Sequence, residues 1–488
     1  MGGVAVKARA GNPRDTEADT RVIPLFEEEA LDEDELQELV DSGEAKSSLR
    51  KLSVTHERVD GRLRRVVLVG AGKRSELDPE RVRIAAAVAA GRARELGARS
   101  LSWAAPEGGQ IAGAVVEGTL LALYRFDRYK SSSDDADGER ADVESLEVVT
   151  SEGGGDATGD VERARVRAEA QNAARDLQNT PSNDATPTYL AERARELADA
   201  HDRLSFEEWD RSQIEDAGMN AFAAVARGSY EEPRLIVLRY DGADAGPLLG
   251  YVGKAVTFDT GGISIKPSGK MHEMKFDMSG GAAVIEAIGA IATLGIPARI
   301  LGVVPATENM PSGRSVKPGD IIRALGGKTI EVNNTDAEGR LILADAISYA
   351  VEQGVERIVD LATLTGAIIT SLGSTYVGLF SNDDGWYDQV HAAGDATGEI
   401  GWRLPLHPEI YELTKGEYAD LTNAADARKA MSSYAAEFLR QFVDDRPWVH
   451  MDIAGVAWGL NRPYVGSGAS GFGVRTLVEL AERAGRAA

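Results

Sequence analysis

Short apolar runs alternate with segments of helical periodicity through the last two thirds of the chain. The runs RLIVLRY, LLGYVGKAVTFD, ARILGVVPA, RIVDLATL and YVGLFS predict strands, and helical segments lie between them. Alternation of strands with helices is typical of a layered sheet. The pattern therefore predicts an α/β fold.

The first third of the chain has the same character. RRVVLVGAGK predicts a buried strand and turn, and LDPERVRIAAAVAAGRARELGA predicts a helix with Asp78 as N-cap and Pro79 in the first turn. VERARVRAEAQNAARDLQNTP predicts a further helix that ends before Pro181. Residues 131–142 and 151–160 are polar and rich in Ser or Gly, so we expect loops there.

The length of 488 residues favours more than one domain. We place the boundary near residue 160, in the second of these polar stretches. The expected organisation is an N-terminal α/β domain over residues 1–160 and a C-terminal domain over residues 161–488. Each is expected to be a mixed β-sheet flanked by helices.

Charge and composition exclude several classes of protein. The chain has 78 acidic and 54 basic residues, a net charge of −24, and so acidic a surface repels nucleic acid and anionic lipid. The best basic patch, RVDGRLRR at residues 58–65, is short. The absence of cysteine excludes disulfides, thiolate nucleophiles and cysteine-bound zinc. HExxH and GxSxG motifs are also missing, so a zincin or a serine hydrolase has little support.

We expect no targeting or membrane segment. The first residues, MGGVAVKARAGNPRDTEAD, lack the apolar centre of a signal peptide, and Val6 stands where a myristoylation pattern requires Ser or Thr. The stretch GGAAVIEAIGAIATLGI is interrupted by Glu286 and is too short to span a bilayer. The sequence therefore predicts a soluble, cytoplasmic protein.

Candidate chemistry begins in residues 250–281. Lys254 lies within what is otherwise an apolar strand, and a buried lysine is costly unless it is neutralised or paired. Asp259 follows at the end of that strand, before two glycines, and Lys266 and Asp277 lie in the loop beyond. Taken singly, each of these residues is explained by a salt bridge or a cap.

A second charged segment, NNTDAEGRLILADAISYA, covers residues 333–350. If its TDAEGR part, residues 335–340, is extended, Asp336, Glu338 and Arg340 share one face. Two carboxylates that face inward repel each other unless cations hold them. With Asp259 and Asp277 this gives four carboxylates, more than one ion needs. Oxygen ligands without His or Cys favour Mg, Mn or Zn, and two ions could share the set. A strand with one solvated face and a structural charge network remains the alternative.

These residues also resemble a known family. NTDAEGRLILADA is similar to the signature of the leucyl aminopeptidase family, the two-metal cytosolic aminopeptidases. VGKAVTFDTGGISIKP, MKFDMSGGAAV, LQNTPSNDATPTYLAE, DLATLTGA and DIAGVAW match further family segments in order and spacing. The resemblance extends from about residue 165 to the end and is weaker in the N-terminal domain.

The resemblance implies a role for each matching residue. It makes the C-terminal domain catalytic, with two divalent ions per subunit (Mn or Zn, with Mg possible), and leaves an oligomer or regulatory role for the N-terminal domain. The implied metal ligands are Asp259 and Glu338 for both ions, Lys254 and Asp277 for the tighter site, and Asp336 for the more exchangeable one. The implied catalytic residues are Lys266 and Arg340.

The resemblance also implies a reaction. A metal-bridging water attacks the first peptide carbonyl, one metal and Asp277 hold the free α-amine, Lys266 stabilises the oxyanion, and Arg340 holds a bicarbonate ion that carries the proton. Leu364, Thr365 and Gly366 would contact the substrate through their backbone. Met278, Thr363 and Ala454 would line a pocket for leucine and other apolar side chains. The partners are peptides with a free N-terminus, and the expected assembly is a homohexamer.

One segment departs from the family pattern. Residues 422–439, TNAADARKAMSSYAAEFL, carry fewer glycines than similar enzymes and include Asp426, Arg428 and Lys429, which leaves the substrate preference open. A DNA-binding regulator, a structural relative without activity and a two-metal phosphatase are the competing functions. The net charge argues against a DNA-binding regulator. The intact site residues argue against an inactive structural relative, and the lack of histidine ligands argues against a phosphatase.

Overall fold

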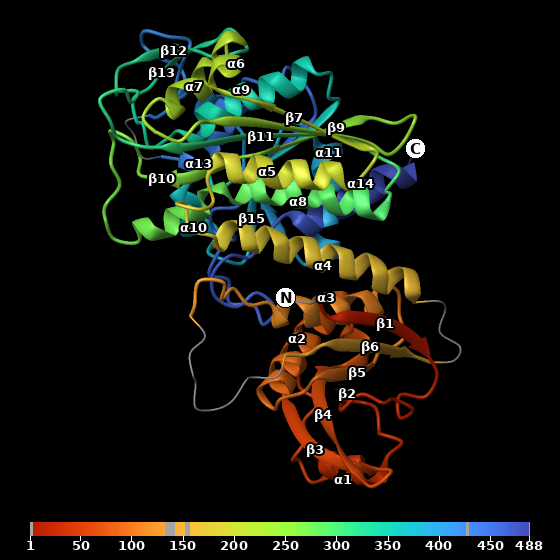
Figure 1. Ribbon diagram of the computed structural model, residues 1–488. Coiled ribbons are helices and arrows are strands. Elements are labelled where there is room, and N and C mark those ends of the chain that lie inside the picture. Colours follow the sequence, from red (N-terminus) through yellow and green to blue (C-terminus); the bar gives the residue numbers. More distant parts are fainter. Residues whose placement is uncertain (1–2, 132–141, 152–156, 426–428, 488) are drawn as a thin grey trace. The chain divides into compact units, whose positions relative to one another are not determined.

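The computed structural model describes residues 3–131, 142–151, 157–425 and 429–487, which form two compact units (Figure 1). Unit 1 comprises Met1–Asn172 and Asn461–Gly466, and unit 2 comprises Ala173–Leu460 and Ser467–Ala488. Each unit is a mixed sheet flanked by helices, so the predicted fold class is confirmed. The role of the first domain stays a prediction.

Unit 1 is built on a six-stranded sheet in the order β1-β6-β5-β2-β4-β3, parallel except for the β3–β4 pair. The predicted cap is present: the Asp78 carboxylate accepts a hydrogen bond of 2.8 Å from the Arg81 backbone N–H, and Pro79 begins α2. The elements are β1 (Ala5–Ala10), β2 (Thr20–Phe26), α1 (Asp34–Asp41), β3 (Leu52–Val59), β4 (Arg62–Gly72), η1 (Arg74–Glu76), α2 (Pro79–Glu95), β5 (Ser100–Ala104), α3 (Ile111–Leu123) and β6 (Ser145–Thr150).

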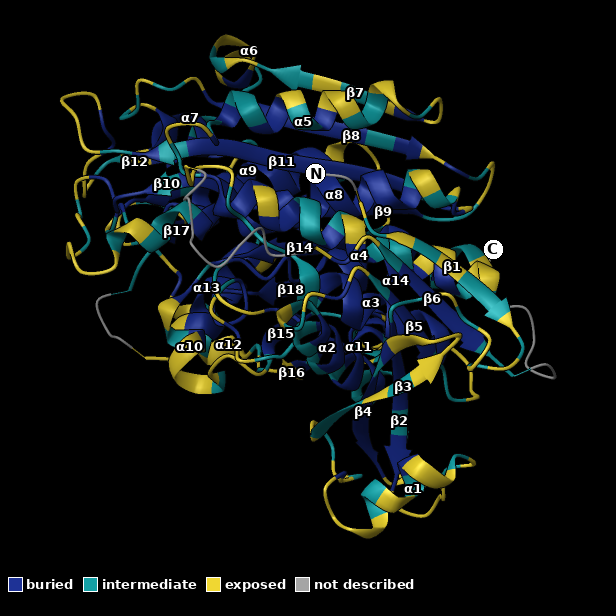
Figure 2. Ribbon diagram, turned by 60° about the horizontal axis from the view of Figure 1, so that its bottom comes forward, coloured by how far each residue is buried: buried dark blue, intermediate teal, exposed yellow. Residues whose placement is uncertain are grey.

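Unit 2 is built on a nine-stranded sheet in the order β16-β15-β18-β14-β9-β11-β8-β7, with β10 also paired to β11. Its centre, β18-β14-β9-β11, is parallel and almost fully buried. Figure 2 shows β11 as a dark strand across the molecule. The strands are β7 (Leu204–Trp209), β8 (Arg234–Asp241), β9 (Leu248–Gly253), β10 (Ala255–Asp259), β11 (Arg299–Asn309), β14 (Arg357–Ala362), β15 (Val377–Ser381), β16 (Gly401–Arg403) and β18 (Trp448–Asp452). A small sheet contains β12 (Ile321–Arg323), β13 (Thr329–Glu331) and β17 (Leu421–Thr422).

Helices cover both faces of this sheet because successive residues of a strand point to opposite sides. On β9, the Tyr251 hydroxyl donates to the carbonyl of Leu477 in α14, whereas Val252 packs with residues of α9. Figure 1 shows α5 and α8 side by side along the sheet. The helices are α4 (Thr158–Asn179), α5 (Pro187–Asp199), α6 (Arg211–Asp216), α7 (Asn220–Ala226), η2 (Met271–Met278), α8 (Ser279–Leu294), α9 (Gly339–Glu352), α10 (Gly366–Leu372), α11 (Asp384–Thr397), α12 (Pro408–Glu412), α13 (Met431–Arg440) and α14 (Val474–Ala487).

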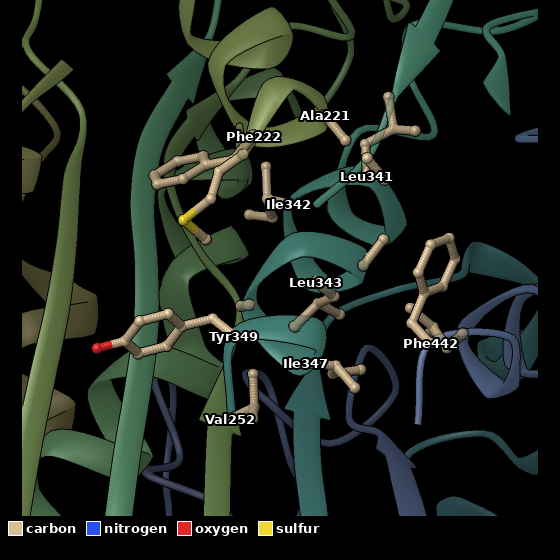
Figure 3. Close-up of a cluster of buried hydrophobic side chains, with 14 of the residues drawn as sticks. Ala221, Phe222, Val252, Leu341, Ile342, Leu343, Ile347, Tyr349 and Phe442 are labelled. Carbon is tan, nitrogen blue, oxygen red and sulfur yellow. The ribbon is translucent and has the colours of Figure 1, made fainter. Parts of the chain in front are cut away.

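A large apolar cluster anchors the start of α9. Leu341, Ile342 and Leu343 are fully buried there, together with Phe222 of α7 and Val252 of β9 (Figure 3). Burying each such side chain stabilises the fold by ~1.5–3 kcal/mol. Because these residues directly follow Arg340, the core fixes the position of the charged residues that precede them.

Three details differ from the sequence-based expectation. Residues 335–340 are not extended: Thr335 and Asp336 form a turn and Glu338 is the N-cap of α9. The strand expected to run through Lys254 is interrupted there, because the Lys254 N–H bonds to the Leu361 carbonyl while its own carbonyl accepts from Gly281. Residues 158–160, expected as loop, belong to α4, and residues 132–141 and 152–156 of the two predicted loops lie outside the described residues.

Within the described residues, one helical stretch, Met271–Leu294, is long and apolar enough to cross a membrane by length and composition alone. However, 83% of its most apolar window is buried inside the protein. Burial of that kind is the property of a core helix, and α8 packs against β9, β11 and β14.

Candidate metal centre

The charged residues singled out in the sequence meet at the carboxyl ends of the central parallel strands. Lys254 follows β9, Asp259 ends β10 and Thr363 follows β14. Asp277 lies near the end of η2, and Glu338 precedes α9. Ligand sites of open α/β sheets form at this edge, where loops from neighbouring strands converge.

Lys254 is the centre of one half of the cluster and is only 2% exposed. Its Nζ donates to Glu338 Oε1 (2.8 Å) and to the Thr363 carbonyl (3.0 Å), and it lies 2.9 Å from Asp277 Oδ1. Gly339 makes this approach possible, since a Cβ at that position would lie 2.6 Å from the same Nζ. The small spacer between the charged residues therefore has a steric reason.

Lys266 is the centre of the other half. Its Nζ lies 2.6 Å from Asp259 Oδ2 and 2.5 Å from Asp336 Oδ1. The second oxygen of Asp259 accepts hydrogen bonds of 2.8 Å from the Gly261 N–H and from the Asn309 amide. Asp259 is thus held from both sides at the end of its strand.

Burial and mutual repulsion shift the acid–base properties of the cluster. Burial, followed by repulsion from Glu338, raises the pKa of Asp259 to about 6, and burial raises the pKa of Asp277 well above its usual value against the attraction of Lys254. Burial also acts to raise the pKa of Glu338, but Lys254 and Lys266 outweigh it and that pKa is lowered. Burial acts to lower the pKa of Lys254, but the carboxylates prevail and raise it. Negative charge is therefore in excess within the cluster.

The donor set fits divalent cations. Four carboxylates face the two ammonium groups, and oxygen atoms of Asp259, Asp336 and Glu338 lie within 4.8 Å of one another. Asp277 Oδ2 and Glu338 Oε2 are buried without a hydrogen-bond partner among the described residues. Unpaired buried carboxylate oxygens are costly, and hard or borderline divalent ions prefer oxygen ligands. The cluster therefore has both the charge and the unused acceptors that a metal centre needs.

Arg340 is the second residue of α9 and is 7% exposed. Its guanidinium donates to the Asn423 carbonyl (2.6 Å) and lies 5.4 Å from the ring centroid of Tyr434, whose hydroxyl bonds to the Thr422 carbonyl. Among the described residues no carboxylate forms an ion pair with Arg340, and its buried Nε has no partner. Burial accordingly lowers the pKa of Arg340. Such a guanidinium is suited to hold an anion.

The residues expected to bind substrate surround the loop after β14. The Thr363 hydroxyl donates to Asp277 Oδ1 (2.7 Å), and the Leu364 N–H donates to Asp452 Oδ1 (3.2 Å). The Ala454 N–H donates to the same oxygen (3.3 Å). Met278, which follows Asp277, is 1% exposed, and Gly366 is the exposed first residue of α10. The structure thus joins Thr363 directly to the charged cluster, whereas Leu364 and Ala454 are joined to each other through Asp452.

Sequence reasoning missed three residues that hold this arrangement, Asn309, Asn423 and Asp452. Asn309 and Asp452 end the buried strands β11 and β18, just as Asp259 ends β10. A polar residue at the carboxyl end of an apolar strand was therefore a usable signal. Asn423 had no such signal, because its partners lie about 90 residues earlier in the chain. Of the segment that departs from the family, Asp426 and Arg428 lie outside the described residues, and Lys429 is exposed.

Known proteins resemble this chain over most of its length. The cytosol aminopeptidase family, catalytic domain, matches residues 172–478, and the N-terminal domain of the same family matches residues 19–133. Probable cytosol aminopeptidases of Roseiflexus castenholzii and Solibacter usitatus are each 44% identical to the chain. The first alignment covers 97% of this chain and 98% of the relative, and the second covers 95% and 96%.

A solved structure of the bottromycin maturation enzyme BotP in complex with Mn superposes with a TM-score of 0.86 at 36% identity. That match covers 96% of this chain and all of the BotP chain. An α/β fold with a buried, carboxylate-rich cluster at its strand ends is the arrangement of a metal-dependent enzyme. The chain belongs to the cytosol aminopeptidase family. It is therefore a metal-dependent aminopeptidase, and peptides are its substrates.

Proposed function

We propose that this enzyme releases leucine and other apolar residues from the N-termini of peptides with the help of two divalent ions per subunit. The observation that carries the proposal is the buried cluster itself, in which four carboxylates exceed two ammonium groups and two carboxylate oxygens have no partner among the described residues. The ions are Mn or Zn, with Mg as a third candidate. Mn in the related BotP supports the first of these.

The residues assigned to the ions follow the two halves of the cluster. Asp259 and Glu338 would be ligands of both ions. Lys254 and Asp277 would bind only one ion, and Asp336 would bind only the other. When bound, the ions would lower the pKa of a water so that it attacks the first peptide carbonyl, and would polarise that carbonyl. The α-amine of the substrate would interact with Asp277, which accounts for cleavage at a free N-terminus only.

Lys266 would stabilise the oxyanion that forms on the attacked carbonyl. Its pKa is raised because the carboxylates of Asp259 and Glu338 outweigh the effect of burial, so it stays an ammonium group at neutral pH. Its side chain is also 22% exposed, so a substrate can reach it. A fixed cation near the developing charge is the usual electrostatic contribution to acyl transfer.

Arg340 would hold bicarbonate, whose chemistry in the site is acceptance and return of a proton. The unpaired Nε and the absence of a carboxylate partner among the described residues support an anion at this place. Tyr434 and Asn423 keep the guanidinium in position.

The preference for leucine rests on the pocket residues. Met278, Thr363 and Ala454 offer apolar or small side chains, and Thr363 is bonded to Asp277. Leu364, Thr365 and Gly366 would contact the peptide backbone. An apolar pocket next to the cation ligands would take an apolar first side chain while the amine lies at the metal centre.

We also propose a cytoplasmic homohexamer, with the N-terminal domain in an oligomer or regulatory role. Exposed apolar side chains of unit 2, among them Tyr230 (99% exposed), Tyr418 (76%) and Ile265 (63%), are available for contacts between subunits. Light scattering after gel filtration tests this directly, and a monomeric mass at micromolar concentration would contradict it.

The function is tested by hydrolysis of leucine p-nitroanilide. Metal-stripped protein is assayed before and after addition of Mn²⁺, at low and high salt, with the N-acetylated substrate as control. Activity that requires metal and vanishes on acetylation supports an aminopeptidase that recognises the free amine. Folded, metal-loaded protein without activity at every salt concentration would contradict it.

The role of Lys266 is tested by Lys266→Ala. Removing one oxyanion stabiliser typically costs ~10²–10³ in kcat, so we expect a loss of that order with little change in Mn²⁺ affinity. Lys317→Ala is the matched control, because Lys317 is an exposed lysine paired with Asp320. A Lys266→Ala enzyme with the wild-type kcat would show that the assignment is wrong.

A further inference from the structure

Asn423 occupies an unusual position beside the charged cluster. It follows the two-residue strand β17, which pairs with β13, and it is fully buried. Its own N–H donates to the Glu331 carbonyl (2.9 Å), so the residue is anchored to the small sheet. A buried amide must have its hydrogen bonds satisfied, and its partners show what it holds.

The Asn423 side chain binds the loop that carries Asp336. Its Oδ1 accepts from the N–H groups of Asn333 (2.9 Å) and Asn334 (3.3 Å). Its Nδ2 donates to the carbonyls of Asn334 (2.7 Å) and Ala337 (3.3 Å). The side chain of Asn334 in turn accepts from the Asp336 N–H (2.9 Å). One amide therefore fixes the backbone on both sides of Asp336.

The backbone of Asn423 holds Arg340. The Arg340 guanidinium donates to the Asn423 carbonyl at 2.6 Å, which is the one hydrogen bond that the described residues offer this side chain. A single residue thus sets the position of Arg340 relative to Asp336. These two groups belong to different parts of the proposed mechanism, cation binding and anion binding.

We infer that Asn423 is a positioning residue that fixes the Asp336 loop and Arg340 relative to each other, an inference that rests on the proposed function. Only an amide can accept from two N–H groups and donate to two carbonyls at this place. Aspartate would keep the acceptors, lose the donors and place a carboxylate against the carbonyls of Asn334 and Ala337. Outer-shell partners of metal ligands typically contribute ~10–100-fold to metal affinity or activity.

The test uses Asn423→Ala and Asn423→Asp in the full-length protein. Asn220→Ala is the matched control, because the Asn220 amide also joins two backbone carbonyls, those of Gly218 and Arg323, away from the cluster. Three quantities are measured: thermal unfolding of the metal-stripped protein, Mn²⁺ affinity by titration calorimetry, and kcat and KM for leucine p-nitroanilide. Calorimetry reports on the Asp336 loop independently of activity.

Both Asn423 variants should bind Mn²⁺ ~10–100-fold more weakly and lose kcat by a similar factor, while KM changes less than threefold because the residue does not touch the pocket. The Asn220 variant should keep the wild-type values. If a folded Asn423 variant retains Mn²⁺ affinity and kcat within threefold of wild type, the inference is wrong. An equal loss in Asn220→Ala would reduce Asn423 to a structural residue and would equally overturn it.

Asn423→Asp keeps the size and the acceptor bonds of asparagine, so it carries the test if Asn423→Ala does not fold. Failure of the positioning role is distinguishable from failure of the proposed function. Wild-type protein that binds no Mn²⁺ and releases no leucine contradicts the function. An active wild type with unaffected Asn423 variants contradicts only the positioning role.

Discussion

Replacing Gly339 with alanine separates two physical effects that act in opposite directions. Gly339 is the first residue of α9 and has no positive φ, so the backbone accepts alanine, and helix propensity favours alanine by at most ~1 kcal/mol, the value for a helix interior. In contrast, the new Cβ would lie 2.6, 2.7 and 2.9 Å from Nζ, Cε and Cδ of Lys254. Propensity predicts a more stable protein, whereas packing predicts a damaged site.

The distances decide which effect prevails. Ordinary carbon contacts lie at ~3.5–4.0 Å, so the end of Lys254 must retreat by roughly 1 Å. The ammonium group then loses its bonds to Glu338 and to the Thr363 carbonyl, of 2.8 and 3.0 Å. Breaking a buried ion pair costs ~3–5 kcal/mol, and the gain in helix propensity offsets about 1 kcal/mol of that. We expect a net loss of roughly 2–4 kcal/mol in the free energy of unfolding of the metal-stripped protein.

The effect on activity should be larger than the effect on folding. A displacement of ~1 Å at a catalytic centre can cost about 10²-fold in rate. The measurements are urea unfolding of the metal-stripped protein, Mn²⁺ affinity by calorimetry, and kcat on leucine p-nitroanilide. Gly385→Ala is the control, because Gly385 lies in the first turn of α11 and its Cβ would make only an ordinary 3.5 Å contact with Asp383.

The outcomes are distinct. The control should be neutral or more stable and fully active, whereas Gly339→Ala should lose both metal affinity and kcat. Wild-type affinity and kcat in Gly339→Ala would refute the steric argument, because they would mean that Lys254 moves without consequence for the site. A loss confined to the free energy of unfolding would refute the assignment of Lys254 to the metal centre.

Two further variants test the surroundings of the site. The Asp452 carboxylate accepts hydrogen bonds from the N–H groups of Leu364, Thr365 and Ala454. Asp452→Ala should therefore release the loop proposed to bind the peptide backbone and raise KM about fivefold, or ~1 kcal/mol. Mn²⁺ affinity should stay within twofold of wild type, and an unchanged KM would contradict this. His450 is fully buried, and its Nδ1 lies 2.6 Å from Asp360 Oδ1. Burial and the positive charge of Arg340 act to lower the pKa of His450, but the carboxylates of Asp360 and Asp452 outweigh them and raise it. Because the pKa of His450 is higher in the folded than in the unfolded protein, protonated His450 stabilises the fold fully below about pH 6.5, the usual histidine pKa. This stabilisation is lost as the pH rises through the pKa of the folded state. The melting temperature should therefore fall from pH 6 to 9 less in His450→Gln than in wild type, and equal slopes would show that the His450–Asp360 pair does not titrate in this range.

Features set by local chemistry could be predicted from the sequence. The Asp78 cap, the strands β8, β11, β14 and β15, and the helix that ends before Pro181 follow from side-chain types within a few residues. The position of Asp259 could also be anticipated, because polar residues at the ends of apolar strands converge on one edge of a parallel sheet. Asp277 in η2 and Glu338 before α9 are not at strand ends, so their grouping with Asp259 was a hypothesis based on charge. Their distances from one another could not, since these depend on long-range packing.

The segment around Asp336 shows why local pattern was insufficient. Charges at alternate positions are typical of a strand with one polar face, yet here the Asn334 side chain takes the Asp336 N–H and produces a turn. The apolar residues from Leu341 onward then bury themselves as a helix, which places Glu338 at its N-cap. Two interactions determine this conformation: the burial of α9, and the hydrogen bonds from Asn423, which is distant in sequence. An interaction that joins residues about 90 positions apart leaves no periodic trace, so the loop and its anchor could be recognised only in the folded chain.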